Sequence, residues 1–76
     1  MKVEIYTKPN CHWCSESKKL LDDNKIEYTN YKIGENITID EVRAKFPDAK
    51  TVPIILFDDV FLGGYQELLW SLTNDT

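Results

Sequence analysis

Cys11-His12-Trp13-Cys14 is the stretch that decides the fold of this 76-residue chain, because it contains both of the chain's cysteines. The run Lys2-Val3-Glu4-Ile5-Tyr6-Thr7 before it alternates β-branched and aromatic residues, which predicts a strand. The segment 15–24 after it has neither Gly nor Pro, as a helix requires. Pro9 and Asn10 suit the turn between strand and helix. The two cysteines are therefore expected at a strand-to-helix junction.

The position of Cys11 at or beside the helix start predicts a redox role. A cysteine reacts as its thiolate, and the unpaired N–H groups and macrodipole of a helix N-terminus favour an anion. We therefore expect Cys11 to be the attacking thiol. Cys14 lies one helical turn further on, on the same side but deeper, and is expected to act as the resolving thiol.

Other roles for the Cys11 and Cys14 pair agree less well with the sequence. A zinc site needs about four ligands, and the chain offers two cysteines and one histidine, His12, which lies between them. We therefore expect no metal. A structural disulfide over so small a ring would remove little loop entropy. Two buried cysteines at chance spacing are disfavoured by the strand-turn-helix context.

Length and charge limit the remaining possibilities. We expect one domain spanning residues 1–76, which buries about 60% of its unfolded surface. The sequence lacks an apolar leader and a run of membrane-spanning length, so we expect a soluble protein in a reducing cytoplasm, with no membrane partner. The net charge of −4 comes from residues 51–76, which hold four acids and no base. This argues against a nucleic-acid partner and favours a solvated acidic face over a docking patch.

The rest of the chain continues as strand, helix, two strands and helix. Residues 26–33 alternate with period two and predict a strand. A capping-box pattern at Thr38 to Glu41 opens a short helix. The apolar run 54–57 predicts a strand buried on both faces, with 60–62 as its hairpin partner and a last helix over 65–72. The residues expected on buried helix faces are Cys14, Ser17, Leu20, Leu21, Ile39, Val42, Phe46, Tyr65, Leu68, Leu69 and Leu72.

Four features make the chain resemble the glutaredoxins, a thioredoxin-fold family. They are Lys8 to Cys14 after the first strand, Thr51-Val52-Pro53, Gly63-Gly64-Tyr65, and the element order β-α-β-α-β-β-α. The resemblance implies an α/β three-layer, thioredoxin-like fold with a four-stranded mixed sheet and three helices. It also implies a monomeric, glutathione-dependent thiol-disulfide oxidoreductase that reduces protein disulfides and glutathione mixed disulfides.

The same resemblance implies a groove for glutathione. The Val52-Pro53 bond is cis in the family, and the backbone of Val52 is then free to pair with a substrate cysteine. Gly63-Gly64 opens the site of the γ-glutamyl carboxylate, where Gln66 replaces one of the two acids found in many members. Trp13 follows His12, and together they replace the Pro-Tyr commonest in the family. The groove residues implied are Lys8, Trp13, Thr51, Val52, Pro53, Gly64, Tyr65, Gln66 and Glu67.

The protein substrate and the reductant stay open at this point. The brevity of the chain is similar to that of compact viral glutaredoxins, which serve ribonucleotide reductase in the host cytoplasm. One alternative is a redoxin that thioredoxin reductase reduces. A second is an iron-sulfur scaffold in which two chains share a cluster through Cys11 and glutathione. A third is a binding or regulatory subunit with an idle CxxC.

Overall fold

The computed structural model describes residues 2–49 and 51–73, which form a mixed sheet with helices on both faces. The strands lie in the order β2-β1-β3-β4, with β1 parallel to β2, β3 antiparallel to β1, and β4 antiparallel to β3. This is the expected thioredoxin-like arrangement. Along the chain the elements are β1 (Val3–Thr7), α1 (His12–Asp23), β2 (Thr29–Lys32), α2 (Ile39–Lys45), β3 (Ile54–Phe57), β4 (Val60–Gly63) and α3 (Tyr65–Thr73).

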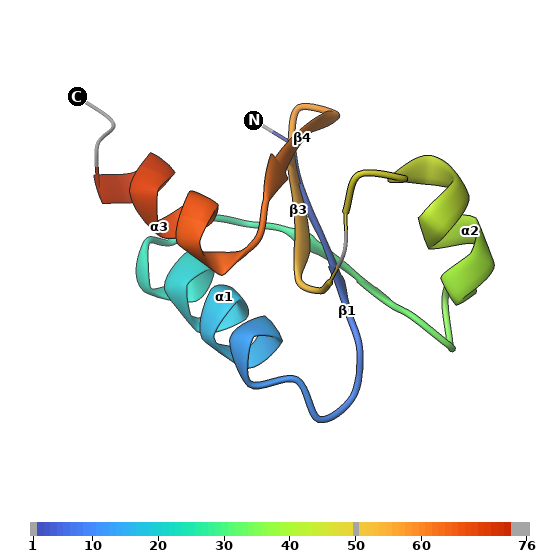
Figure 1. Cartoon of the computed structure of the whole chain (residues 1–76). Helices are drawn as coiled ribbons and strands as arrows, with labels where there is room; N and C mark the ends of the chain where they lie inside the picture. The colour runs from blue at the N-terminus through green and yellow to red at the C-terminus, as the bar shows by residue number, and fades with distance from the viewer. Residues whose placement is uncertain (1, 50, 74–76) are drawn as a thin grey trace.

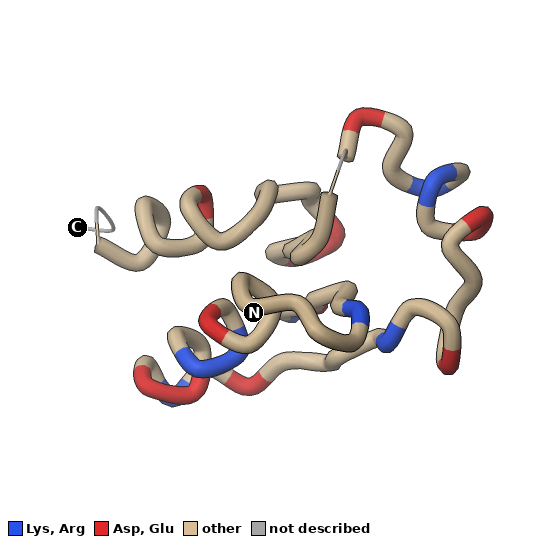
Figure 2. The backbone as a smooth tube through the Cα atoms, turned by 60° about the horizontal axis from the view of Figure 1, so that its bottom comes forward, with Lys and Arg blue, Asp and Glu red and all other residues tan. Residues whose placement is uncertain are grey.

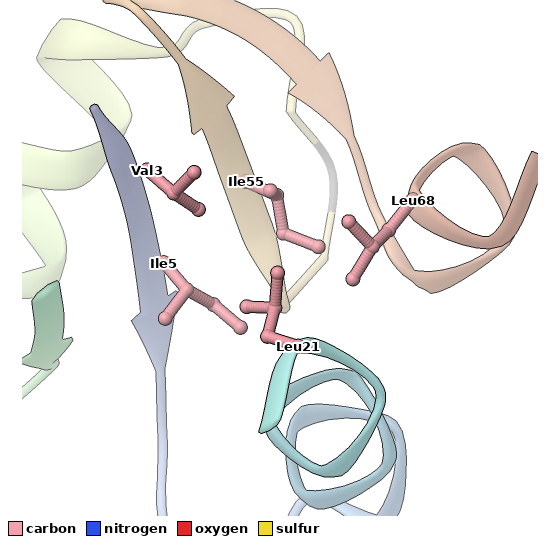
Figure 3. Packing of buried hydrophobic residues seen from close by; sticks show 5 residues of the cluster. All are labelled: Val3, Ile5, Leu21, Ile55 and Leu68. Carbon is pink, nitrogen blue, oxygen red and sulfur yellow. The ribbon is translucent and has the colours of Figure 1, made fainter. Parts of the chain in front are cut away.

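The helices divide between the two faces of the sheet (Figure 1). Helices α1 and α3 cover one face, and α2 lies on the other. Successive strand side chains point to opposite faces, so each central strand supplies both cores. Figure 3 shows the first core, between the sheet, α1 and α3, formed by Val3, Ile5, Leu21, Ile55 and Leu68. The second core, beneath α2, is formed by Tyr6, Val42, Ile54 and Leu56.

The two central strands are buried as expected. All five residues of β1 are buried, as are Ile54, Ile55 and Leu56 of β3. Ile5 and Ile55 are direct partners in the antiparallel register, and neither is accessible to solvent. The β3–β4 hairpin turns at Asp58 and Asp59, both with positive φ, as a tight two-residue turn requires. The strand that leads into α1, β1, is thus central in the sheet and paired with both β2 and β3.

Two predictions for the helices are confirmed, the capping box of α2 and the burial of Ser17 in α1. Thr38 Oγ1 accepts a hydrogen bond from the Glu41 N–H at 3.1 Å, and Glu41 Oε1 accepts one from the Thr38 N–H at 3.2 Å, so the capping box forms. Ser17 is fully buried, as expected for a residue on the Cys14 side of α1. Its hydroxyl donates to the Trp13 carbonyl at 2.8 Å, which satisfies the buried oxygen within the helix.

The start of the second strand differs from the prediction of 26–33, because β2 begins at Thr29. Lys25 has a positive φ of 57°, and the Ile26 N–H donates to the Leu21 carbonyl at 2.9 Å. The chain therefore folds back onto the end of α1 before the strand begins. Ile26 and Tyr28 pack against the first core from this connection, which accounts for the apolar pattern that suggested an earlier strand.

Two residues predicted on buried helix faces are exposed. Ile39, the first residue of α2, is 46% exposed, because this seven-residue helix buries only Val42. Leu69 of α3 is 38% exposed, whereas its neighbour Leu68 is fully buried. Leu68 faces the sheet and α1 (Figure 3). Leu69 is not among the residues packed against this core. Both helices therefore bury a narrower stripe than the periodicity predicted.

The charged residues are distributed unevenly over the fold (Figure 2). The described part of α3 carries one acid, Glu67, and the described residues from 51 onward include no Lys or Arg. The described Lys and Arg residues all lie between positions 2 and 45, on α1, β2 and α2 and in the segments next to the N-terminal elements. Among the described residues, no helix has the length and apolar character needed to cross a membrane.

Candidate active site

Cys11 caps the N-terminus of α1. Its backbone is extended, with φ −111° and ψ 109°, and its Sγ accepts a hydrogen bond from the Cys14 N–H at 3.2 Å. The sulfur thus takes the place of the oxygen that an N-cap side chain usually supplies. The residue is partly exposed and its thiol is free. A sulfur held by a first-turn N–H and open to solvent is well placed to attack as an anion.

Cys14 lies behind Cys11 and is 2% exposed. The pKa of the Cys14 thiol is raised to about 12, first by burial and then by the hydrogen bond between the two cysteine side chains. The backbone N–H of Lys8 opposes this shift. Cys14 therefore keeps its proton at neutral pH while Cys11 is the accessible sulfur. This asymmetry is the one predicted for an attacking and a resolving thiol.

A groove of about 560 Å³ is lined by Trp13, the residue before Cys14, although neither Cys11 nor Cys14 lines it. Its wall includes Trp13, from the first turn of α1, and the residues around Pro53 and the start of α3. Eight of the nine residues predicted for the groove line it, Lys8 being the exception. Lys8 is exposed in the turn before α1. The fold thus brings together three segments that are far apart in the sequence.

Direct contacts hold these three segments together. The rings of Trp13 and Tyr65 lie 5.0 Å apart, which joins the starts of α1 and α3. The Val52-Pro53 bond is cis. A Cβ built on Gly64 would lie 3.4 Å from the Pro53 carbonyl oxygen, an ordinary contact distance, so the proline loop and the start of α3 are neighbours.

Four groove residues were not identified from the sequence. Asp48 and Ala49 lie in the loop before the cis-proline, and Phe61 and Leu62 lie in β4. Phe61 is 42% exposed, and its ring lies 6.1 Å from that of Phe46. The one signal in the sequence was an aromatic residue, Phe61, in the strand predicted as the hairpin partner at the end of the sheet.

Glu67 makes an unexpected contact at the start of α3. Its Oε1 accepts a hydrogen bond from the Gly64 N–H at 2.8 Å. The Gly64 carbonyl in turn accepts from the Leu68 N–H at 3.0 Å, so Gly64 is the N-cap and Glu67 the third residue of the helix. This is the glutamate half of a capping box. The side chain predicted to meet glutathione is thus already bonded to the backbone.

A helix-capping thiol with a buried partner thiol three residues on, presented by a four-stranded mixed sheet, defines a thioredoxin-like thiol-disulfide oxidoreductase. The family model described as Glutaredoxin matches residues 3–62. The chain belongs to the glutaredoxin family.

Curated relatives agree with this assignment. The chain is 35% identical to Glutaredoxin 3 of Escherichia coli over 66 residues, which cover 87% of this chain and 80% of that protein. It is 33% identical to the hybrid peroxiredoxin hyPrx5 of Haemophilus influenzae over 66 residues. That match again covers 87% of this chain but only 27% of the peroxiredoxin, so the chain spans about a quarter of that relative's length.

Solved structures agree on the fold. Glutaredoxin 1 from Francisella tularensis, complexed with cacodylate, superposes with a TM-score of 0.84 at 26% identity over 97% of this chain and 94% of that one. A buckwheat glutaredoxin-glutathione complex also gives a TM-score of 0.84, at 21% identity over 96% of this chain and 69% of that one.

Proposed function

We propose that this protein is a glutathione-dependent oxidoreductase that reduces glutathione mixed disulfides and protein disulfides. The observation that carries the proposal is the capping position of Cys11 over a buried, protonated Cys14, with Trp13 between them in the sequence lining a groove. The family assignment supports thiol-disulfide chemistry in general. Glutathione as the reductant is supported by the groove and by the bound glutathione of the buckwheat relative.

The reaction begins when the Cys11 thiolate attacks the glutathione sulfur of a mixed disulfide. The S–S bond breaks, the substrate thiolate leaves and takes up a proton, and Cys11 is joined to glutathione. A second glutathione thiolate then attacks this disulfide, which releases oxidised glutathione and restores the Cys11 thiolate. With a protein disulfide, the Cys11 thiolate first attacks one of its two sulfurs, which breaks the S–S bond and joins Cys11 to the substrate. The Cys14 thiol then attacks the sulfur of Cys11 and gives its proton to the substrate thiolate that leaves. The substrate leaves reduced, and a Cys11–Cys14 disulfide remains for two glutathione molecules to reduce.

In this proposal the groove holds the glutathione part of the disulfide in line with Cys11. The backbone of Val52 pairs with the cysteinyl residue of the ligand, and Trp13 covers its apolar surface. The N–H groups of Tyr65 and Gln66, at the start of α3, receive the γ-glutamyl carboxylate. Glu67 faces the ligand's ammonium group. Lys8, which does not line the groove, would reach the glycine carboxylate of the ligand.

The test is turnover of a glutathionylated peptide with glutathione, glutathione reductase and NADPH. We expect the unaltered protein and Cys14→Ser to be active, because glutathione itself can resolve the mixed disulfide. Reduction of a protein disulfide should be lost in Cys14→Ser. Cys11→Ser should lose both activities. Activity of Cys11→Ser in either assay would show that the two roles are assigned wrongly.

A redoxin reduced by thioredoxin reductase is the second candidate. Two observations favour it, because both weaken the case for tight glutathione binding. The Glu67 carboxylate is hydrogen-bonded to the Gly64 N–H, and Gln66 takes the place of an acid. Replacing glutathione and its reductase with thioredoxin reductase in the NADPH assay separates the two. Ribonucleotide reductase is the proposed protein substrate, and its turnover with the reduced protein as the only electron donor tests that step.

A further inference from the structure

The outer side of α3 carries a stripe of uncharged side chains. Its members recur at positions i, i+3, i+4 and i+7 and so share one side of the helix; they are Gln66, Leu69, Trp70 and Thr73. Trp70 is 69% exposed and Leu69 is 38% exposed, whereas Leu68, on the sheet side, is fully buried. Neither Leu69 nor Trp70 is among the residues packed against the two cores. Burial of apolar surface in the fold therefore does not account for these two large apolar side chains.

This stripe begins at the groove and continues beyond it. Gln66 lines the groove, and Trp70 follows four residues later, about 6 Å further along the helix axis. Trp13, which also lines the groove, is 53% exposed, and its ring lies 5.0 Å from that of Tyr65. Tyr65 and Leu69 are four residues apart and are therefore neighbours on the helix surface. The exposed apolar surface thus extends from the first turn of α1 along α3.

A protein disulfide can cover more of this surface than glutathione does. The residues proposed to hold glutathione extend along α3 only as far as Glu67, whereas a protein substrate brings further chain on either side of its cysteine. Glu67 is the one charged residue in the described part of α3, and the described residues from 51 onward include no Lys or Arg (Figure 2). An apolar segment with basic flanking residues is therefore complementary to the stripe, and an acidic segment is not.

We propose that Leu69 and Trp70 form a docking surface for protein substrates, and that its occupant is an apolar segment with basic flanking residues near the substrate disulfide. This inference rests on the proposed function and deepens it, because it names the class of protein that is reduced. A tryptophan buries a large apolar area, and a few such residues supply most of the binding energy of protein interfaces. The surface therefore discriminates among protein disulfides and leaves glutathione mixed disulfides unaffected.

The test compares three disulfide-cyclised peptides that differ only in a tail of about six residues, which can span roughly 20 Å. The tail is made of Leu and Lys, of Ser and Lys, or of Leu and Glu. Turnover is measured with glutathione, glutathione reductase and NADPH. We expect kcat/KM for the Leu and Lys tail to exceed that for each of the others by about three- to tenfold. In Trp70→Ala that advantage should be lost, mainly through a higher KM, while turnover of a glutathionylated peptide without a tail stays the same.

Three further variants complete the design. Val60→Ala shortens an apolar side chain of similar exposure, 66%, on β4 and outside the groove, and it should keep the preference for the Leu and Lys tail. Leu69→Ala should reduce that preference, because it removes the neighbouring part of the surface. Trp70→Phe keeps an aromatic side chain and should retain most of the preference. Urea denaturation of each variant verifies that it is folded.

Three results would overturn the proposal. They are equal kcat/KM of the unaltered protein for the three tails, equal losses in Trp70→Ala and Val60→Ala, and a dimer in sedimentation that Trp70→Ala dissociates. The last would mean that a second copy of the chain covers this surface. Turnover of the peptide without a tail separates the two proposals. A protein that is active on it but shows no tail preference contradicts this inference alone, whereas inactivity on every substrate contradicts the proposed function and this inference with it.

Discussion

The protonation of Cys14 couples its chemistry to the stability of the protein. Burial raises its pKa from the ordinary 9.0 to about 12, so the folded state holds this proton more tightly than the unfolded state does. The resulting stabilisation is complete below about pH 9 and is lost as the pH rises towards 12. Over that interval we expect the free energy of unfolding to fall more steeply than in Cys14→Ser, by up to about 1.4 kcal/mol per pH unit.

Urea denaturation between pH 8 and 11, in the presence of a reductant, measures this difference. The Cys14→Ser variant is the matched control because the other groups that titrate at high pH, among them Tyr28 and Tyr31, are present in both proteins. Parallel pH profiles for the two proteins would mean that Cys14 is not held protonated by its surroundings.

Gly63 is expected to be intolerant of a side chain, for two separable reasons. Gly63→Ala would strain the backbone at φ 136° and would press against Glu67 Cγ at 2.6 Å. We expect a loss of about 1–3 kcal/mol in the free energy of unfolding. In a Glu67→Ala background the side-chain clash is absent, so the same substitution should cost less. A double-mutant cycle from urea denaturation measures the difference, and strictly additive costs would show that Glu67 does not fill this space.

At the scale of residues, the roles of side chains that depend on their spacing in the sequence could be predicted. Contacts between residues that are far apart in the sequence could not. Cys11 and Cys14 follow from their spacing and from the helix start. Asp48 and Phe61 enter the groove only because β3 and β4 bring the proline loop and the hairpin against the start of α3. The bond from Glu67 to Gly64 depends on the φ of Gly63, which the residue type permits but does not determine.

Helix α2 depends strongly on its cap. It has seven residues and buries only Val42, so little packing supports it. Thr38→Ala removes the oxygen that accepts the Glu41 N–H, and we expect a loss of about 1 kcal/mol in the free energy of unfolding. Thr38→Ser keeps that oxygen and should stay close to the unaltered protein. Equal destabilisation by Ala and Ser in urea denaturation would show that the hydroxyl is not the source of the effect.

At the scale of elements, the order of strands and helices could be predicted because each has a local signal. The capping box gave the start of α2, and the apolar run 54–57 gave β3. The width of a buried helix face has no such signal. Ile39 and Leu69 fit the apolar period, yet both are exposed, because α2 packs only against the sheet through Val42 and α3 packs against the sheet and α1 through Leu68. Likewise, β2 begins late because residues 25 and 26 first turn back onto α1.

For the whole molecule, α3 and α1 share a single core with the sheet. Leu68 is fully buried in this core, and Leu69, one residue further on, is 38% exposed. Leu68→Ala should lower the free energy of unfolding by about 2–5 kcal/mol, because it leaves a cavity between three elements. Leu69→Ala should change it by less than about 0.5 kcal/mol. Chemical denaturation of both variants measures the contrast, and similar losses would contradict the observed orientation of α3.

The central place of β1 affects how the protein is made. Its partner residues in β3 come 50 positions later, since Ile5 pairs with Ile55. At a synthesis rate of about 5–20 residues per second, the ribosome produces Ile55 roughly 3–10 seconds after Ile5. Cys11 and Cys14 emerge within that interval, before the strand that completes the sheet behind them exists. The nascent chain therefore carries two unprotected thiols for seconds, and an oxidant met at that stage would reach the sulfur that the finished fold buries.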